Sequence, residues 1–72
     1  MISSSVIIHC KESYLTDLLK LGLDPIYNDG EYDVIVDDVS HEYMDGTYQD
    51  PDIELCEHYG INYDQVNCIE LA

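Results

Sequence analysis

The stretch YNDGEYDVIVDD, residues 27–38, decides the fold of this chain. Its Asn28-Asp29-Gly30 segment contains the residue types that tolerate the positive φ angles of a tight hairpin turn. The residues that follow, Glu31 to Asp38, alternate as a strand does. One face carries Tyr32, Val34 and Val36, and the other carries Glu31, Asp33, Ile35 and Asp37. The pattern predicts a hairpin whose second strand has one core face and one mostly anionic face.

The chain before this hairpin predicts a strand and a helix. Residues Ser4 to Cys10 form a β-branched run typical of a buried strand. Ser13 is placed to cap a helix, and Gly22 stands where the left-handed conformation ends one. The apolar positions of this helix fall at the spacing of one face, namely Tyr14, Leu15, Leu18, Leu19 and Leu21.

The chain after the hairpin predicts a second helix and a last strand. Between Val39 and Gln49 the pattern is weak and indicates a loop or a small second hairpin. Asp50 then precedes Pro51, a residue favoured at the first helical position, and Gly60 supplies the stop. The inner face of this helix is expected to carry Ile53, Cys56 and Tyr59. Residues Gln65 to Leu71 predict the final strand.

The expected order is strand, helix, strand, strand, helix, strand. This βαββαβ order predicts an α+β domain of the split βαβ, ferredoxin-like type, with an antiparallel sheet and two helices on one face. A different small α+β sheet is the alternative. At 72 residues the chain is expected to form a single domain, residues 1–72. Its apolar content of 46% and its seven tyrosines distinguish it from acidic disordered chains.

The charge of the chain is strongly asymmetric. No lysine or arginine follows Lys20, yet the remaining 52 residues carry 14 of the 16 aspartates and glutamates. The formal net charge is -14 at pH 7. A field of one sign repels its own fold and attracts basic surfaces, and solubility alone needs a net charge of only about 2 to 8. The charge therefore indicates a kind of partner and no particular reaction.

The spacing of the carboxylates resembles a row of phosphates. Side chains on one strand face are roughly 6.5 to 7 Å apart, and those three or four residues apart on a helix are roughly 5 to 6 Å apart. Lysine and arginine that bind phosphates could bind such a row. The residues expected to bind the partner are Glu31, Asp33, Asp37, Asp38, Glu42, Tyr43, Asp45, Tyr48, Asp50, Asp52, Glu54 and Glu57.

Small size, extreme acidity, an acidic hairpin and intact core patterning together resemble the phage-encoded DNA-mimic inhibitors, which include some anti-CRISPR and anti-restriction proteins. The resemblance covers the composition from Gly22 to Ala72 and carries over no individual contact residues. It implies an inhibitor that occupies the basic nucleic-acid channel of a host defence or DNA-processing complex. The alternative is an acidic adaptor that binds an ordinary protein through its tyrosine-bearing loop, with Tyr43 and Tyr48 as the contacts.

Other chemistry has weak support. Five residues could bind zinc, but none has the paired spacing of a structural site: His9, Cys10, Cys56, His58 and Cys68. The acidic segments with Gly30 and Gly46 lack the twelve-residue loop of a calcium site and are better explained as turns. No nucleophile stands at a spacing that pairs it with a base. We expect no catalytic residue, no cofactor and no specific metal.

The composition also predicts the cellular location, the excluded partners and the oligomeric state of the chain. The three cysteines are an odd number without the spacing of a disulfide framework, and the first residues lack a secretory signal, so a cytoplasmic location is expected. Nucleic acids and anionic membranes would repel the chain, so neither is an expected direct partner. The chain is expected to be a monomer or a weak homodimer, since an exposed strand edge favours pairing and like charge opposes it.

Overall fold

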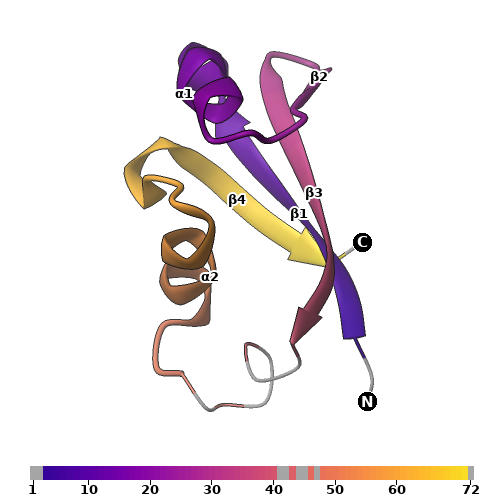
Figure 1. The fold of residues 1–72 in the computed structure, drawn as a ribbon, viewed down its shortest axis with the longest axis vertical. Coiled ribbons are helices and arrows are strands. Elements are labelled where there is room, and N and C mark those ends of the chain that lie inside the picture. Colours follow the sequence, from indigo (N-terminus) through magenta and orange to yellow (C-terminus); the bar gives the residue numbers. More distant parts are fainter. Residues whose placement is uncertain (1–2, 41–42, 44–45, 47, 72) are drawn as a thin grey trace.

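In the computed structural model, which describes residues 3–40, 43, 46 and 48–71, the chain forms a four-stranded antiparallel sheet with helices on one face (Figure 1). The strands are β1 (Ser3–Lys11), β2 (Ile26–Asn28), β3 (Glu31–Ser40) and β4 (Val66–Leu71). The helices are α1 (Leu15–Lys20) and α2 (Pro51–Tyr59); a 3₁₀ turn, η1 (Glu12–Tyr14), directly precedes α1, and another, η3 (Tyr63–Gln65), directly precedes β4. The predicted βαββαβ order is confirmed.

The strand order β2-β3-β1-β4 identifies the topology. The connection through α1 links β1 to β2 with β3 between them, and the connection through α2 links β3 to β4 with β1 between them. Every neighbouring pair is antiparallel. Two interleaved βαβ units of this kind make the split βαβ arrangement that the sequence predicted.

The predicted hairpin turn forms as a two-residue loop. Asn28 pairs with Glu31, and the two residues between them, Asp29 and Gly30, have φ angles of 49° and 84°. Positive φ at both central positions is the requirement of a type I′ turn, which matches the twist of the flanking strands. This turn fixes the register of β2 against β3.

Strand β3 is longer than the alternation predicted, because it contains a bulge. Ser4 pairs with Val39 and Val6 with Val36, so two residues of β3, Asp37 and Asp38, lie opposite one residue of β1. Asp38 has a φ of 57°, a left-handed conformation that aspartate tolerates better than most residues. The bulge returns Val39 to the inner face, where it is buried.

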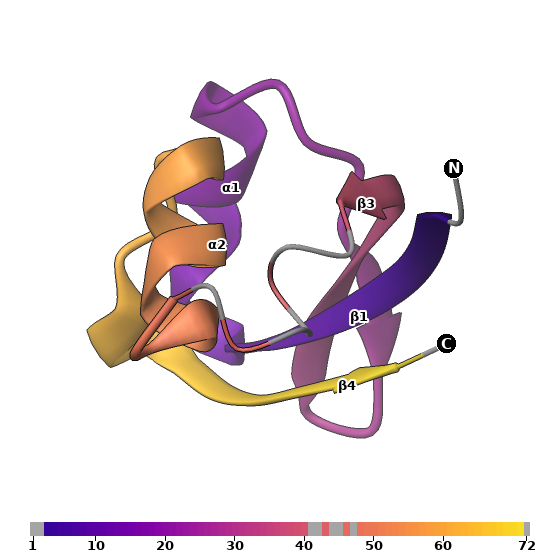
Figure 2. The same cartoon turned by 90° about the horizontal axis from the view of Figure 1, so that it is seen from below.

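The core lies between the inner face of the sheet and the helices (Figure 2). Alternate residues of β1 and β3 supply most of it, and both helices add side chains. Its buried apolar members are Val6, Ile8, Cys10, Tyr14, Leu18, Val34, Val36, Val39, Leu55, Cys56 and Ile61. Both cysteines are fully buried, so they fill space as small apolar side chains.

The structure confirms where the two helices lie in the sequence, but some of the predicted capping and buried residues were wrong. Ser13 does not cap α1, because it lies inside η1 and Tyr14 holds the capping position without a side-chain bond. Leu19 is 57% exposed, so the predicted apolar face of α1 is only partly buried. In α2, Asp50 and Gly60 bound the helix as predicted, although the Asp50 side chain makes no capping bond. The buried residue next to Cys56 is Leu55, and the predicted Ile53 lies at the exposed margin.

Candidate functional site

The outer face of the sheet lies opposite the helices, and its residues form rows across the strands. Alternate residues of β1 pack into the core. The residues between them therefore lie on the outer face, namely Ser5, Ile7, His9 and Lys11. Register pairs place Asp33 of β3 and Cys68 of β4 on either side of His9. Directly paired residues point to the same side of an antiparallel sheet, so these side chains share the outer face.

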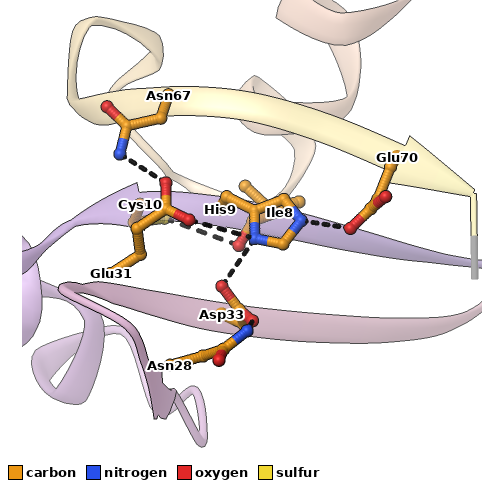
Figure 3. Close-up of polar contacts among 8 residues, drawn as sticks. All are labelled: Ile8, His9, Cys10, Asn28, Glu31, Asp33, Asn67 and Glu70. Carbon is orange, nitrogen blue, oxygen red and sulfur yellow. Dashed lines mark hydrogen bonds and ion pairs between the residues drawn. The ribbon is translucent and has the colours of Figure 1, made fainter.

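His9 lies at the centre of a carboxylate cluster on this face (Figure 3). Its Nδ1 atom is 2.6 Å from Asp33 Oδ1, and its Nε2 atom is 2.5 Å from Glu70 Oε1. Glu31 Oε1 lies 3.7 Å from Nδ1. His9 and Asp33 are each only 7% exposed, although no helix covers this side of the described structure. We call His9, Glu31, Asp33 and Glu70 the His9 cluster.

Two asparagines hold the outer oxygens of this cluster. Asn28 donates from Nδ2 to Asp33 Oδ2 over 3.1 Å, and Asn67 donates from Nδ2 to Glu31 Oε2 over 2.7 Å. Asn67 is the extra residue of a bulge in β4, since Cys68 pairs with His9 while Val66 pairs with Cys10. The bulge turns the Asn67 amide toward β3. The resulting polar network joins all four strands.

The cluster favours a positively charged His9. Burial by itself would lower the pKa of His9, but hydrogen bonds to Glu70 and Asp33 and the charges of those carboxylates outweigh it and raise the pKa. Because both ring nitrogens face carboxylate oxygens, both donate hydrogen bonds, which is the pattern of the protonated imidazolium. In this state His9 neutralises part of the charge that three glutamate and aspartate side chains bring together. Neither nitrogen is then free to act as a base.

Apolar side chains border the His9 cluster. Ile7 pairs with Ile35, which is 49% exposed, and Ile26 of the edge strand is 55% exposed. At the far end of the face, the Ser5 hydroxyl donates to Asp37 over 2.7 Å. The outer face is therefore a mixed surface of carboxylates and isoleucines, with much of its charge satisfied internally.

Helix α2 carries the second group of carboxylates, on the other side of the sheet. Asp50, Asp52, Glu54 and Glu57 are all exposed, and the ion pairs found among the described residues involve His9 instead. Asp50 precedes the first helical residue, and Glu54 and Glu57 are three residues apart within the helix, so the Cβ atoms of this pair are roughly 5 to 6 Å apart. We call these four residues the α2 acidic surface.

The structure separates the predicted contact residues into different places. Asp33 does not belong to an exposed acidic row as expected, because its side chain is buried and bonded to His9 and Asn28. Glu31 and Asp37 lie on the outer face, Asp38 is exposed at the bulge, and the α2 acidic surface lies on the opposite layer. Glu42 and Asp45 lie outside the described residues. The twelve residues therefore do not form one surface.

Tyr43 and Tyr48, the predicted tyrosine contacts, stack on each other. Their ring centroids are 5.1 Å apart with an interplanar angle of 24°, and both side chains are half-buried. Tyr43 also lines a small apolar groove between the sheet and the start of α2. The groove is bordered by Val6, Val39, Tyr43, Pro51, Asp52, Leu55, Ile69, Glu70 and Leu71.

The five residues considered for zinc do not converge. Cys10 and Cys56 lie in the core, His9 and Cys68 lie on the outer face, and His58 is exposed on α2. Burial raises the pKa of both core thiols to about 11, with smaller contributions from Asp33 and Glu31 at Cys10, and from Cys10 and Asp52 at Cys56. Desolvation also raises the pKa of the exposed Cys68 thiol, together with the charges of Glu31, Glu70 and Asp33. Raised values keep thiols protonated and weak as nucleophiles.

A different metal-binding combination is present on the outer face. His9, Glu31 and Asp33 each offer one donor atom, and these atoms lie within 4.8 Å of one another. The sequence reasoning missed this grouping, because the three residues are brought together by the β1–β3 register and not by a motif. A histidine at an outward position of an apolar strand was the available signal.

Comparisons of the chain with protein-family models, with curated proteins and with solved structures found no match. Within residues 3–40, 43, 46 and 48–71, no helix has the length and apolar character needed to cross a membrane.

Proposed function

We propose that this protein is a non-enzymatic inhibitor that binds the basic nucleic-acid-binding surface of a host defence or DNA-processing complex by imitating phosphate charge. The proposal places it in the cytoplasm, where anti-CRISPR and anti-restriction proteins of this kind would meet their targets. Its contact region is the α2 acidic surface. The outer face of the sheet is a less suitable contact, because its carboxylates bond to His9, Asn28 and Asn67.

The observation that carries the proposal is the exposed glutamate near the end of α2. Asp52 and Glu54 lie in the first turn, where the helix dipole favours negative charge. Glu57 lies near the other end, where the dipole disfavours it, and it is three residues from Glu54. Like charges at this spacing destabilise a helix by roughly 0.2 to 0.5 kcal/mol per pair. The helix dipole and the like-charge spacing both disfavour Glu57, and binding to a basic partner would account for a glutamate at this position.

The row of carboxylates also suits the proposed partner physically. Lysine and arginine side chains that contact nucleic-acid backbones form charge-assisted bonds with oxygen anions, and carboxylates are acceptors of the same kind. The net charge of -14 would accelerate association with a basic channel and make it sensitive to salt.

Displacement by DNA tests this function. The immobilised protein is exposed to bacterial lysate, and the captured proteins are measured with and without duplex DNA at constant ionic strength. Two double variants compare position at equal net charge: Glu54→Gln with Glu57→Gln on α2, and Glu12→Gln with Asp24→Asn elsewhere on the exposed surface. We expect DNA to release a partner from the wild type, the α2 double variant to lose that partner, and the control to retain it. Equal losses in both variants would contradict a defined contact surface.

The stacked tyrosines favour the second candidate, an acidic adaptor. Tyr43 and Tyr48 present a half-buried aromatic pair beside the apolar groove, and tyrosine is enriched at the energetic centres of interfaces. In that case Tyr48→Ser would weaken capture more than the α2 double variant does. Duplex DNA would not release the partner.

A further inference from the structure

We infer that His9, Asp33 and Glu31 form a binding site for one divalent transition-metal ion of the zinc type. The site lies on the outer face of the sheet and is independent of the proposed binding to a basic partner. Each residue offers one donor atom within 4.8 Å of the other two, and His9 Nδ1 lies 2.6 Å from Asp33 Oδ1 and 3.7 Å from Glu31 Oε1 (Figure 3). Imidazole nitrogen and carboxylate oxygen are both established zinc ligands.

The arrangement of the remaining polar atoms supports the site. Metal-binding histidines commonly donate their second ring N–H to a carboxylate, and metal-binding carboxylates are themselves hydrogen-bonded. Here His9 Nε2 bonds to Glu70, Asp33 Oδ2 accepts from Asn28, and Glu31 Oε2 accepts from Asn67. Each of the three proposed ligands therefore has its other polar atom held by a different neighbour. One donor atom of each ligand is left facing the others.

Burial and rigidity distinguish this cluster from an acidic patch in solvent. His9 and Asp33 are each 7% exposed and lie on the two central strands of the sheet. Ligands on paired strands lose little conformational freedom when they bind. The imidazole nitrogen also favours a transition metal over calcium and magnesium, which prefer oxygen ligands.

The distances need only small adjustments to fit an ion. Zinc lies about 2.0 to 2.2 Å from nitrogen and oxygen ligands, so tetrahedral donors are about 3.3 Å apart. The Nδ1 to Asp33 distance would open from 2.6 Å, and the Nδ1 to Glu31 distance would close from 3.7 Å. Zinc replaces the proton on His9 Nδ1, and this proton passes to solvent. A water molecule completes the coordination.

The first test is a calorimetric titration of chelator-treated protein with ZnCl₂ near pH 7.5 and about 0.15 M salt, where long-range charge effects are reduced. We expect one ion per chain. The informative variant is Glu31→Gln, which removes a metal-binding oxygen anion but can still accept the bond from Asn67. Its matched control is Asp37→Asn, which makes the same charge change on the same strand and face. We expect Glu31→Gln to weaken zinc binding at least tenfold and Asp37→Asn to leave it unchanged.

Cobalt and calcium provide the second test. Co²⁺ should give the visible absorption of a four-coordinate nitrogen and oxygen site in the wild type, and Glu31→Gln should lose that absorption while its circular dichroism stays native. Cys68→Ser should keep the zinc affinity, because the thiol is not one of the three ligands. The inference would be overturned by absence of zinc binding, by equal losses in the two carboxylate variants, by loss of binding in Cys68→Ser, or by Ca²⁺ competing with zinc at equal concentration.

Discussion

The His9 cluster and the α2 acidic surface use the same carboxylate chemistry for opposite purposes. In the cluster, one buried histidine binds carboxylates from the strands on both sides of it, and two asparagines complete the bonds. On α2, four carboxylates are exposed, and Glu54 and Glu57 lie at a spacing where like charges repel. The carboxylates that make up the net charge of this chain therefore fall into two groups, which differ in burial and in hydrogen bonding. Some are bonded within the sheet, and others are exposed on α2, where we propose that the partner binds.

Removal of His9 should have the largest effect on stability. His9→Leu leaves the buried Asp33 without its cation, and loss of one partner of a buried pair costs about 3 to 5 kcal/mol. His58→Leu is the matched control, because His58 is exposed on α2 and its ring packs edge-on against Tyr59. We expect the control to change the free energy of unfolding by at most about 0.5 kcal/mol. Urea unfolding followed by circular dichroism measures both, and equal losses would remove the distinction between the two regions.

The His9 cluster should make the stability of the protein depend on pH. The pKa of His9 in the folded protein is raised above its ordinary 6.5, because the bonds and charges of Glu70 and Asp33 outweigh desolvation. A raised pKa gives stabilisation that is complete below pH 6.5 and is lost as pH rises through the folded value. Chelator-treated protein should therefore lose stability from pH 6.5 upward.

The comparison with His9→Leu isolates this effect. The variant should show a flatter pH profile than the wild type over the same range. Measurements should stay below pH 9.0, the ordinary value of the thiols, whose raised pKa values would add a further loss above it. A wild-type profile that is flat or rises from pH 6.5 to 8.5 would contradict a charged His9.

Charge reversal on α2 should have the smallest effect, and its sign should be opposite. Glu57→Lys places a cation near the helix end that favours it and three residues from Glu54, so we expect a gain of about 0.5 kcal/mol. Glu31→Lys places a cation beside His9 and should destabilise the protein. Thermal unfolding at low and high salt measures both, and a loss of stability in Glu57→Lys would show that the α2 carboxylates are needed by the fold.

Local signals explain how far the sequence predicted the fold. The Asp29-Gly30 turn, the alternation of β3 and the Asp50-Pro51 start of α2 are properties of a few neighbouring residues, and all three are confirmed. The burial of Leu55 in place of Ile53 was missed, because the rotation of a short helix is set by the sheet against which it packs. The order of the elements and these local signals were sufficient to predict the βαββαβ topology, but not which side of α2 is buried.

The His9 cluster was less predictable than the fold, because its contacts join residues that are far apart in the sequence. The pairing of His9 with Asp33 depends on the register between β1 and β3, and the contact of Asn67 with Glu31 depends on a bulge in β4. Neither feature has a local signature in the sequence. Asp33 was therefore assigned to an exposed acidic row although it lies bonded beneath the surface. The α2 carboxylates were easier to place, because their exposure does not depend on the register of a partner strand.

Backbone amide NMR of the labelled protein during titration with a hexa-arginine peptide tests the central claim most directly. The account predicts that at low salt the largest chemical-shift changes fall on residues 50–59, that amides beside His9 and Asp33 change little, and that high salt removes the changes. Changes that are largest around the His9 cluster, or spread evenly over all exposed carboxylates, would contradict the division of charge into a structural part and a binding part.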